Sequence, residues 1–416
     1  MDFERGGIAV TREADARVGV GAGLPSSGRR PELQALRALA VVAVVINHSW
    51  PGLAPGGYFG VDIFFVVSGF LITRQLVRER DLRGRISLPR FYLRRARRLL
   101  PAATLVLLAV AAMTFFFVPE REWRVWFGEI AASALYVQNW AVVAAGPEAT
   151  AVTHFWSLSV EEQFYLFWPV IVIGGAALAG VLRRSARMVL IAVVVLIAAA
   201  SLVHWIVVTA GDYDLGYFST LSRAWEFAAG ALVALVPAEL RRGSRWAPVL
   251  FWAGLAAVVA AVLVVGPNLP HTLALLPVLG TVAIIVSSNH HPPASARWLV
   301  ELRPVQFTGD ISYALYLWHW PVLLFAPLIT GVPSESWFMV LLLAFAVALS
   351  WATTRFVENP ARRTPLQGAG FRARRVLVAG GVTFGLLAIL GLADAGTRVS
   401  SQHTVACVER VVVGTD

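Results

Sequence analysis

The sequence predicts an all-α polytopic membrane protein, with a bundle of ten transmembrane helices followed by an eleventh. Of its 416 residues, 57% are hydrophobic and only 14% are charged, which is too apolar for a soluble protein of this size. Apolar stretches of about 18 or more residues recur from end to end. Clusters of arginine fall in alternate connecting loops, as the positive-inside rule requires of a chain that crosses a bilayer repeatedly.

The hydropathy pattern places the ten helices of the bundle and the eleventh helix at eleven apolar stretches. These lie near 36–51, 58–77, 99–118, 156–181, 188–210, 218–237, 247–266, 272–288, 306–329, 337–357 and 376–393. The longest intervening loop, 119–155, has an apolar part that Glu129, Gln138 and Asn139 interrupt. We expect this part to lie at the membrane surface or to dip into it. If it crossed, every later loop would change sides and the arginine pattern would break.

The arginines also predict the orientation and the domain boundaries. All 35 basic residues are arginine, and the loop arginines cluster at 78–98, 183–187, 241–245, 297–303 and 362–375. The intervening loops have almost none apart from Arg121 and Arg124. The positive-inside rule places these loops and the N-terminus in the cytoplasm of a multi-pass cell-membrane protein. We expect a disordered cytoplasmic extension at 1–30, a membrane domain at 31–365, the eleventh helix at 376–393 and a short extracytoplasmic tail at 394–416. Loop arginines account for the net charge of +10, so no nucleic-acid partner is expected.

Composition excludes several kinds of chemistry. The chain has no lysine, which excludes a Schiff-base lysine and a P-loop lysine. Cys407 is its single cysteine, which excludes an intramolecular disulfide, a cysteine-based zinc site and a CxxC redox pair. No metal is expected.

The first predicted span carries two polar residues at different depths. Arg37 and His48 stand eleven positions apart in an apolar run, which is about 16 Å of helical rise and half of a hydrocarbon core. Such residues usually face a polar cavity, because facing lipid is costly. In the alternative interpretation, Arg37 extends to lipid phosphates and His48 is a solvated residue at the opposite end.

An arginine-rich segment follows the second span. In residues 91–101, FYLRRARRLLP, Arg94 and Arg98 share a helix face, and so do Arg95 and Arg98. Guanidinium groups bind phosphate in a bidentate manner, which indicates a site for a polyanion. Positive-inside charge alone also explains the segment.

Carboxylates gather near the opposite side of the membrane. Asp62 begins the second span, where the helix dipole alone also favours it. Glu161 and Glu162 follow Ser159, and Ser159-x-x-Glu162 is a capping box. Arg223 and Glu226 are i, i+3 neighbours that line a cavity or form a simple ion pair.

The ninth predicted span carries a polar stripe. Ser312, Tyr316 and His319 follow i, i+4 and i+7 on an apolar helix, and Pro321 is expected to kink it beside His319. The stripe lines a cavity or joins helices by packing. Ser68, in the glycine-rich second span, is a further candidate for the cavity wall.

Seven segments together resemble the acyltransferase 3 family of membrane-bound O-acyltransferases. They cover about residues 31–363 in the family's order. They are Arg37 with His48, GYFGVDIFFVVSGFLIT, FYLRRARRLLP, HFWSLSVEEQFYLFWP, YFSTLSRAWEFAAG, GDISYALYLWHWP and RFVENPARR.

The resemblance implies a ten-helix fold and transfer of an acyl group, usually acetyl from acetyl-CoA, to a hydroxyl of a glycan or other small acceptor. It maps the family's arginine and histidine of the first helix to Arg37 and His48. Its arginine motif corresponds to Arg95 and Arg98, and its glutamate motif to Glu161 and Glu162. Some members add an extracytoplasmic SGNH hydrolase-like domain. Nothing similar follows the eleventh stretch here, so we expect either that this domain is absent by design, with a separate extracytoplasmic partner in its place, or that the chain is truncated.

These observations suggest a mechanism. Acyl-CoA phosphates bind the arginines, the pantetheine arm passes Arg37, and the thioester approaches His48. His48 is the general base or a transient acyl carrier, and Glu161 or Glu162 orients it. Arg37 or Arg223 holds the thioester oxygen or a phosphate.

Three alternatives stay open at this point. The acceptor is an extracytoplasmic glycan or lipid-linked sugar of the cell envelope, or it is a cytosolic small molecule such as a macrolide-type antibiotic. Intramembrane His, Glu and Arg residues are also typical of a transporter. The expected partners are therefore the lipid bilayer, acyl-CoA and the acceptor, with a homo-oligomer also compatible.

Overall fold

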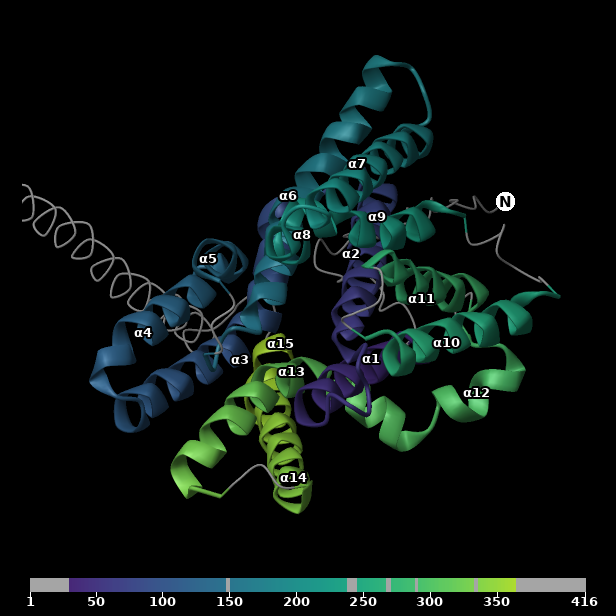
Figure 1. Cartoon of the computed structure of the whole chain (residues 1–416). Coiled ribbons are helices and arrows are strands. Elements are labelled where there is room, and N and C mark those ends of the chain that lie inside the picture. The colour runs from purple at the N-terminus through teal and green to yellow at the C-terminus, as the bar shows by residue number, and fades with distance from the viewer. Residues whose placement is uncertain are drawn as a thin grey trace, which may run out of the picture.

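The computed structural model describes residues 30–146, 150–237, 245–266, 271–288, 291–332 and 336–363. Helices and their connections make up these segments, and no strand occurs among them (Figure 1). The elements are α1 (Pro31–Ser49), η1 (Gly57–Phe59), α2 (Gly60–Arg83), α3 (Leu88–Phe117), α4 (Glu120–Ala134), α5 (Gln138–Ala145), α6 (Phe155–Val181), α7 (Ala186–Thr209), α8 (Tyr213–Phe218), α9 (Thr220–Leu235), α10 (Ala247–Val264), η3 (His271–Ala274), α11 (Leu275–Ser287), α12 (Ala294–Val300), α13 (Arg303–Thr330), α14 (Ser336–Thr353), η4 (Thr354–Glu358) and α15 (Asn359–Arg363).

The predicted fold class is confirmed in this part of the chain. Each of the ten spans expected for the bundle coincides with a helix, and seven helical segments are long and apolar enough to cross a membrane. The other three are α1, which includes Glu32 and Arg37, and the shorter helices α9 and α11, with 16 and 13 residues. The predicted eleventh helix, the tail and the extension expected at 1–30, apart from Arg30, lie outside the described residues.

The central helices approach one another closely. α2 packs against α1 and α9, and α1 packs against α13. A Cβ atom at Gly69 would lie 2.0 Å from the carbonyl oxygen of Phe227, and one at Gly230 would lie 1.9 Å from that of Val66. Only glycine permits this separation of α2 and α9, as small residues do at membrane helix interfaces. This contact aligns α2, which forms one wall of the site described below.

Two helices are longer than the hydropathy pattern predicts. α3 begins at Leu88, eleven residues before the expected span, so the arginine-rich segment is its first part rather than a loop. Pro89 lies in the first turn, where its missing N–H is harmless, and Pro101 lies within the helix. The last residue of α2 is Arg83, and the helix is capped by Gly84, whose backbone is in the left-handed region with a φ of 70°. Hydropathy detects only the apolar part of each helix.

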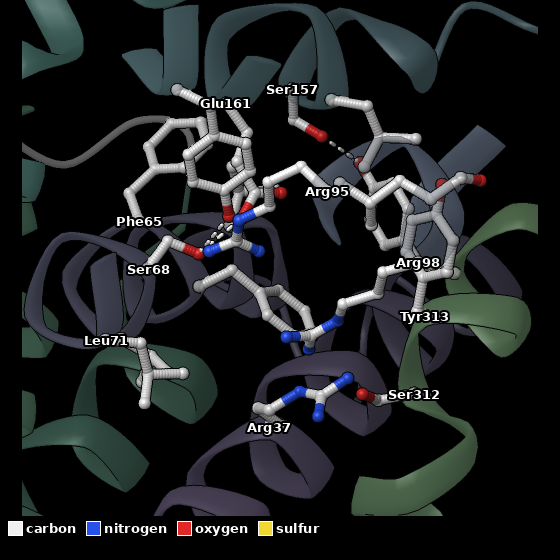
Figure 2. Close-up of a pocket in the computed structure, with 17 residues that line it drawn as sticks. Arg37, Phe65, Ser68, Leu71, Arg95, Arg98, Ser157, Glu161, Ser312 and Tyr313 are labelled. Carbon is white, nitrogen blue, oxygen red and sulfur yellow. Dashed lines mark hydrogen bonds between the residues drawn. The ribbon is translucent and has the colours of Figure 1, made fainter. Parts of the chain in front are cut away.

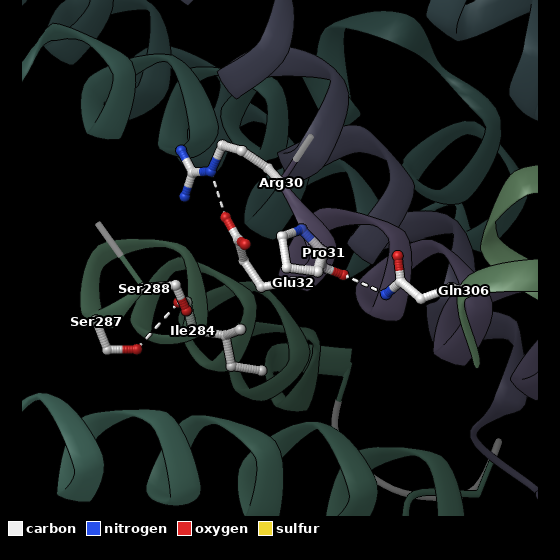
Figure 3. Close-up of polar contacts among 7 residues, drawn as sticks. All are labelled: Arg30, Pro31, Glu32, Ile284, Ser287, Ser288 and Gln306. Atoms are coloured by element: carbon white, nitrogen blue, oxygen red, sulfur yellow. Dashed lines mark hydrogen bonds and ion pairs between the residues drawn. The ribbon is translucent and has the colours of Figure 1, made fainter. Parts of the chain in front are cut away.

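Polar contacts hold the beginning of α1 against α13 (Figure 3). The Gln306 amide donates to the carbonyl oxygens of Pro31 (2.9 Å) and Val300 (2.7 Å). Arg30 pairs with the fully buried Glu32. In the same view, the hydroxyls of Ser287 and Ser288 donate to the carbonyl oxygen of Ile284 at the end of α11. The bond from Gln306 to Pro31 is the one of these contacts that joins α13 to the first helix, from which Arg37 projects.

The loop at 119–155 contains two short helices. α4 and α5 have 15 and 8 residues, so neither is long enough to cross a core of about 30 Å. Glu129 of α4 is buried and accepts hydrogen bonds from Gln138 Nε2 (3.0 Å) and from the Thr150 hydroxyl. Two of the polar residues that interrupt this apolar segment, Glu129 and Gln138, therefore hold its two helices together.

Candidate functional site

A cavity lies between five helices, α1, α2, α3, α6 and α13 (Figure 2). Its volume is about 60 Å³. This is well below the usual range of small-molecule sites, about 300–1,000 Å³, so a ligand fits only when side chains of the wall move. Its walls are Arg37, Val61, Phe64, Phe65, Val67, Ser68, Leu71, Arg95, Arg98, Leu99, Ser157, Leu158, Glu161, Tyr165, Ser312, Tyr313 and Tyr316.

Three guanidinium groups converge on the cavity. Figure 2 shows Arg37 from α1 and Arg95 and Arg98 from α3 on different sides of the same space. Arg37 Nη1 donates to Gln34 Oε1 over 3.0 Å, and Arg95 lies over the Tyr165 ring, 4.1 Å from its centroid. Among the described residues, none of the three arginines forms an ion pair with a carboxylate. Most of their N–H groups are therefore free to bind a ligand.

One carboxylate faces the three cations. Glu161 accepts hydrogen bonds from the hydroxyls of Ser68 and Tyr165, which are themselves 3.0 Å apart. The lining thus holds three arginines and one glutamate, a formal charge of +2. The three arginines are half-buried, so each loses part of its hydration without a carboxylate partner, and an anionic ligand would offset that cost. The geometry therefore favours an anion here.

Hydroxyl groups close the far end of the cavity. Tyr316 Oη is 2.6 Å from Ser157 Oγ and donates to the carbonyl oxygen of His154 over 3.0 Å. Beyond Tyr316, His48 Nδ1 is 2.9 Å from His319 Nε2. The sequence predicts one continuous cavity from Arg37 to His48. In this structure Tyr316 and Ser157 interrupt it, and neither imidazole of this pair lines the cavity.

The structure brings together seven of the fourteen residues that the sequence suggests for the site, one of which is Ser312 of the polar stripe. The other six are Arg37, Ser68, Arg95, Arg98, Glu161 and Tyr316. His48 and His319 form the pair just described. Arg94 Nη2 instead bonds Glu79 Oε2 over 2.9 Å, outside the cavity, and Glu162 does not line it. The expected contact between a glutamate and His48 is replaced by the contact with His319, because Glu161 bonds Ser68 and Tyr165.

The remaining three predicted residues form a buried ion cluster that does not line the cavity. Arg223 Nη2 is 3.0 Å from Asp62 Oδ2, and its Nη1 is 3.1 Å from Glu226 Oε1. All three side chains are at most 2% exposed. The guanidinium carbon of Arg223 lies 5.7 Å from the centroid of the Phe65 ring. Phe65 also lines the cavity. The cluster thus supports the cavity wall from behind.

Three residues at the site are absent from the sequence prediction. Tyr165 and Ser157 lie four residues after and before Glu161, so helical spacing places them on its face. His154 begins the same segment, and its contacts are to α13. Spacing was a usable signal for Tyr165 and Ser157, whereas no local pattern links His154 to a helix 160 residues away.

Comparison with known proteins identifies the family. The family model described as "Acyltransferase domain" matches residues 30–355, which is most of the chain. The chain belongs to this acyltransferase family. All five helices of the cavity lie within the matched residues.

Curated relatives share the same region. The chain is 30% identical to "Peptidoglycan O-acetyltransferase OatA" of Listeria monocytogenes over 360 residues, which cover 80% of this chain and 56% of that protein. It is 29% identical to "Putative peptidoglycan O-acetyltransferase YrhL" of Bacillus subtilis over 367 residues, which cover 84% and 57%. The chain therefore spans a little more than half the length of these relatives. No solved structure matches it.

Proposed function

We propose that this protein is a membrane O-acyltransferase of the cell envelope. It moves an acetyl or other short acyl group from cytosolic acyl-CoA to a hydroxyl of an extracytoplasmic glycan or lipid-linked sugar. The observation that carries this proposal is the cavity of formal charge +2 inside the region that matches the acyltransferase family. The names of the peptidoglycan O-acetyltransferase relatives support the glycan acceptor.

The cavity suits the donor in both of its chemical parts. Coenzyme A carries phosphates, for which the forked donors of Arg37, Arg95 and Arg98 are complementary. Its pantetheine arm and a short acyl group are less polar, and Phe64, Leu71 and other apolar side chains form the remaining wall. The positive-inside rule predicts that the arginine-rich segments face the cytoplasm. Acyl-CoA is found on that side of the membrane.

The transfer itself is assigned to the end of the cavity at Tyr316. The acceptor oxygen attacks the thioester carbon, His48 Nε2 takes the hydroxyl proton, the carbon–sulfur bond breaks, and the thiolate of coenzyme A then accepts a proton. Arg37 and His48 are about 16 Å apart along α1, so one extended donor can reach from the arginines towards the histidine. The step requires movement of the Tyr316 and Ser157 side chains, which separate the cavity from His48 in this structure.

The first experiment tests the phosphate site. Purified protein is assayed with radiolabelled acetyl-CoA and a glycan acceptor, and the double variant Arg95→Ala with Arg98→Ala is compared with wild type. Loss of charge-assisted hydrogen bonds of about 1.5–3 kcal/mol each predicts a rise in donor KM of at least tenfold. Arg90→Ala is the matched control, because Arg90 is an exposed cation of the same helix. Unchanged donor binding in the double variant would contradict the proposal.

A second experiment tests the side of transfer. In cells that express the protein, envelope glycans and soluble metabolites are separated and each fraction is analysed for O-acetyl groups. Acetyl groups that appear in the glycan fraction support the proposed acceptor. Acetyl groups confined to a cytosolic small molecule keep the chemistry but overturn the acceptor. Transport without any acyl transfer would overturn the enzyme assignment.

A further inference from the structure

Three imidazole rings lie together beyond the closed end of the cavity. His48 comes from α1, His154 precedes α6, and His319 comes from α13. The rings of His48 and His319 are nearly parallel, with 5.2 Å between centroids, and those of His154 and His319 are 5.5 Å apart. In the part of the chain that the structure describes, no group of three such side chains is arranged to hold a metal ion. The hydrogen bonds of this group determine where its protons are.

Pro321 fixes the proton of His154. A proline within a helix has no N–H to donate to the carbonyl four residues earlier, which here is that of Leu317. His154 Nε2 lies 3.2 Å from that carbonyl oxygen. A carbonyl oxygen only accepts hydrogen bonds, so Nε2 of His154 carries the proton.

The carbonyl oxygens of its own helix fix the proton of His319 in the same way. His319 Nδ1 lies 3.1 Å from the carbonyl oxygen of Leu315 and 2.7 Å from that of Tyr316. Nδ1 therefore carries a proton. The side chain is fully buried, and among the described residues no carboxylate contacts it, so an imidazolium there would be a buried, unpaired charge. In the neutral ring the other nitrogen, Nε2, can only accept.

The remaining contact then determines the tautomer of His48. Because His319 Nε2 accepts, His48 Nδ1, at 2.9 Å, must donate. The lone pair of His48 is thus on Nε2, which has no hydrogen-bond partner among the described residues. We propose that His319 is a positioning residue, which orients His48 and holds it in the tautomer whose Nε2 accepts a proton. This inference rests on the proposed function, in which His48 Nε2 is the base.

His319 thus occupies the place that a carboxylate has in a Ser-His-Asp triad. There, an acceptor at Nδ1–H leaves Nε2 free for proton transfer. Here the acceptor is a neutral nitrogen, itself oriented by two main-chain carbonyls. It supplies direction and the correct tautomer without adding a second charge to a buried site.

Variants at 319 test the acceptor role kinetically. His319→Leu keeps similar bulk but removes the acceptor, whereas His319→Gln offers an amide oxygen to His48 Nδ1–H. We expect His319→Leu to lower kcat about 100-fold, with donor KM changed less than about twofold. His319→Gln should recover at least tenfold of the lost kcat. Equal activity of the two variants, or wild-type kcat in His319→Leu, would overturn the inference.

A spectroscopic measurement on the wild-type chain does not depend on activity. The full chain, labelled with nitrogen-15 at histidine and reconstituted in lipid, is examined by correlating ring nitrogens with ring protons. Loss of one signal set in His48→Ala assigns His48. A protonated Nδ1 and a bare Nε2 support the inference, and the opposite tautomer overturns it. If Nδ1 of His48 is protonated but the wild-type protein transfers no acyl group, the proposed function fails while the inferred proton positions stand.

Discussion

The buried cluster of Asp62, Arg223 and Glu226 allows a prediction in which the sign of the removed charge decides the outcome. One guanidinium bridges two carboxylates over 3.0 and 3.1 Å, so the cluster has a formal charge of −1. Arg223→Met removes the only cation and leaves two carboxylates facing each other out of water. Glu226→Gln removes the excess negative charge and leaves Arg223 paired with Asp62.

The magnitudes follow from burial. Breaking a fully buried ion pair by deleting one partner costs about 3–5 kcal/mol, because the other charge stays desolvated. Replacing Glu226 by the neutral amide keeps the Arg223–Asp62 pair and removes the second, excess carboxylate, so the change should be about 1 kcal/mol. At about 2 °C per kcal/mol for a chain of this size, Arg223→Met should lower the unfolding midpoint by about 6–10 °C. Glu226→Gln should change it by about 2 °C or less.

The assay is thermal unfolding of the purified protein in detergent, followed by the fluorescence of its 15 tryptophans. All variants are heated at one scan rate, because membrane proteins unfold irreversibly and the apparent midpoint depends on that rate. Asp62→Asn is a second control, since it also leaves one cation with one carboxylate. A midpoint for Arg223→Met equal to that of Glu226→Gln, or a lower midpoint for Glu226→Gln, would refute the charge argument.

Three further predictions address the cavity and its walls. Gly69→Ala should destabilise the protein by about 1–3 kcal/mol, because the added Cβ would lie 2.0 Å from a main-chain oxygen of α9. The unfolding midpoint measures this loss. Gly174→Ala is the control, because a Cβ at position 174 would meet open space. Tyr165→Phe keeps the ring beneath Arg95 but loses the hydroxyl that donates to Glu161. The KM for the acyl donor should therefore change less in Tyr165→Phe than in Tyr165→Leu, which also loses the ring. Equal donor KM values in the two variants would contradict this. Raising the salt concentration should increase donor KM and leave kcat nearly unchanged, because phosphate contacts at an open site are screened; initial rates at several ionic strengths test this.

Much of the architecture was predictable because lipid imposes strong rules on sequence. Helices that cross a bilayer are apolar over most of their length, and all ten expected spans of the bundle coincide with a helix, although α9 and α11 have only 16 and 13 residues. Their ends were less predictable. α3 extends back to Leu88 through the arginine-rich segment, since helix formation depends on backbone conformation and hydropathy does not record it. Elements shorter than a span, such as α5, produce no distinct apolar signal.

Within the site, local pairs were predictable and distant ones were not. Arg223 and Glu226 are three residues apart on one helix, and they do form an ion pair. Asp62, the third member, lies 161 positions away on α2, and only the packing of α2 against α9 brings it there. The contact of His48 with His319 spans 271 positions and likewise depends on the packing of α1 against α13. Glu161 was expected to orient His48, whereas its actual partners are Ser68 and Tyr165.

These cases share a physical reason. A polar side chain within an apolar helix must find a partner, because an unpaired polar group in a low-dielectric interior is costly. The sequence therefore marks which residues make contacts between helices, and only the fold decides the partner. The charge of Arg223 is paired with two carboxylates, and the two ring nitrogens of His319 contact two carbonyl oxygens and an imidazole, all inside the protein. Among the described residues, Arg95 and Arg98 line the cavity without such compensation, which is why an anion bound there, rather than another part of this fold, best explains their position.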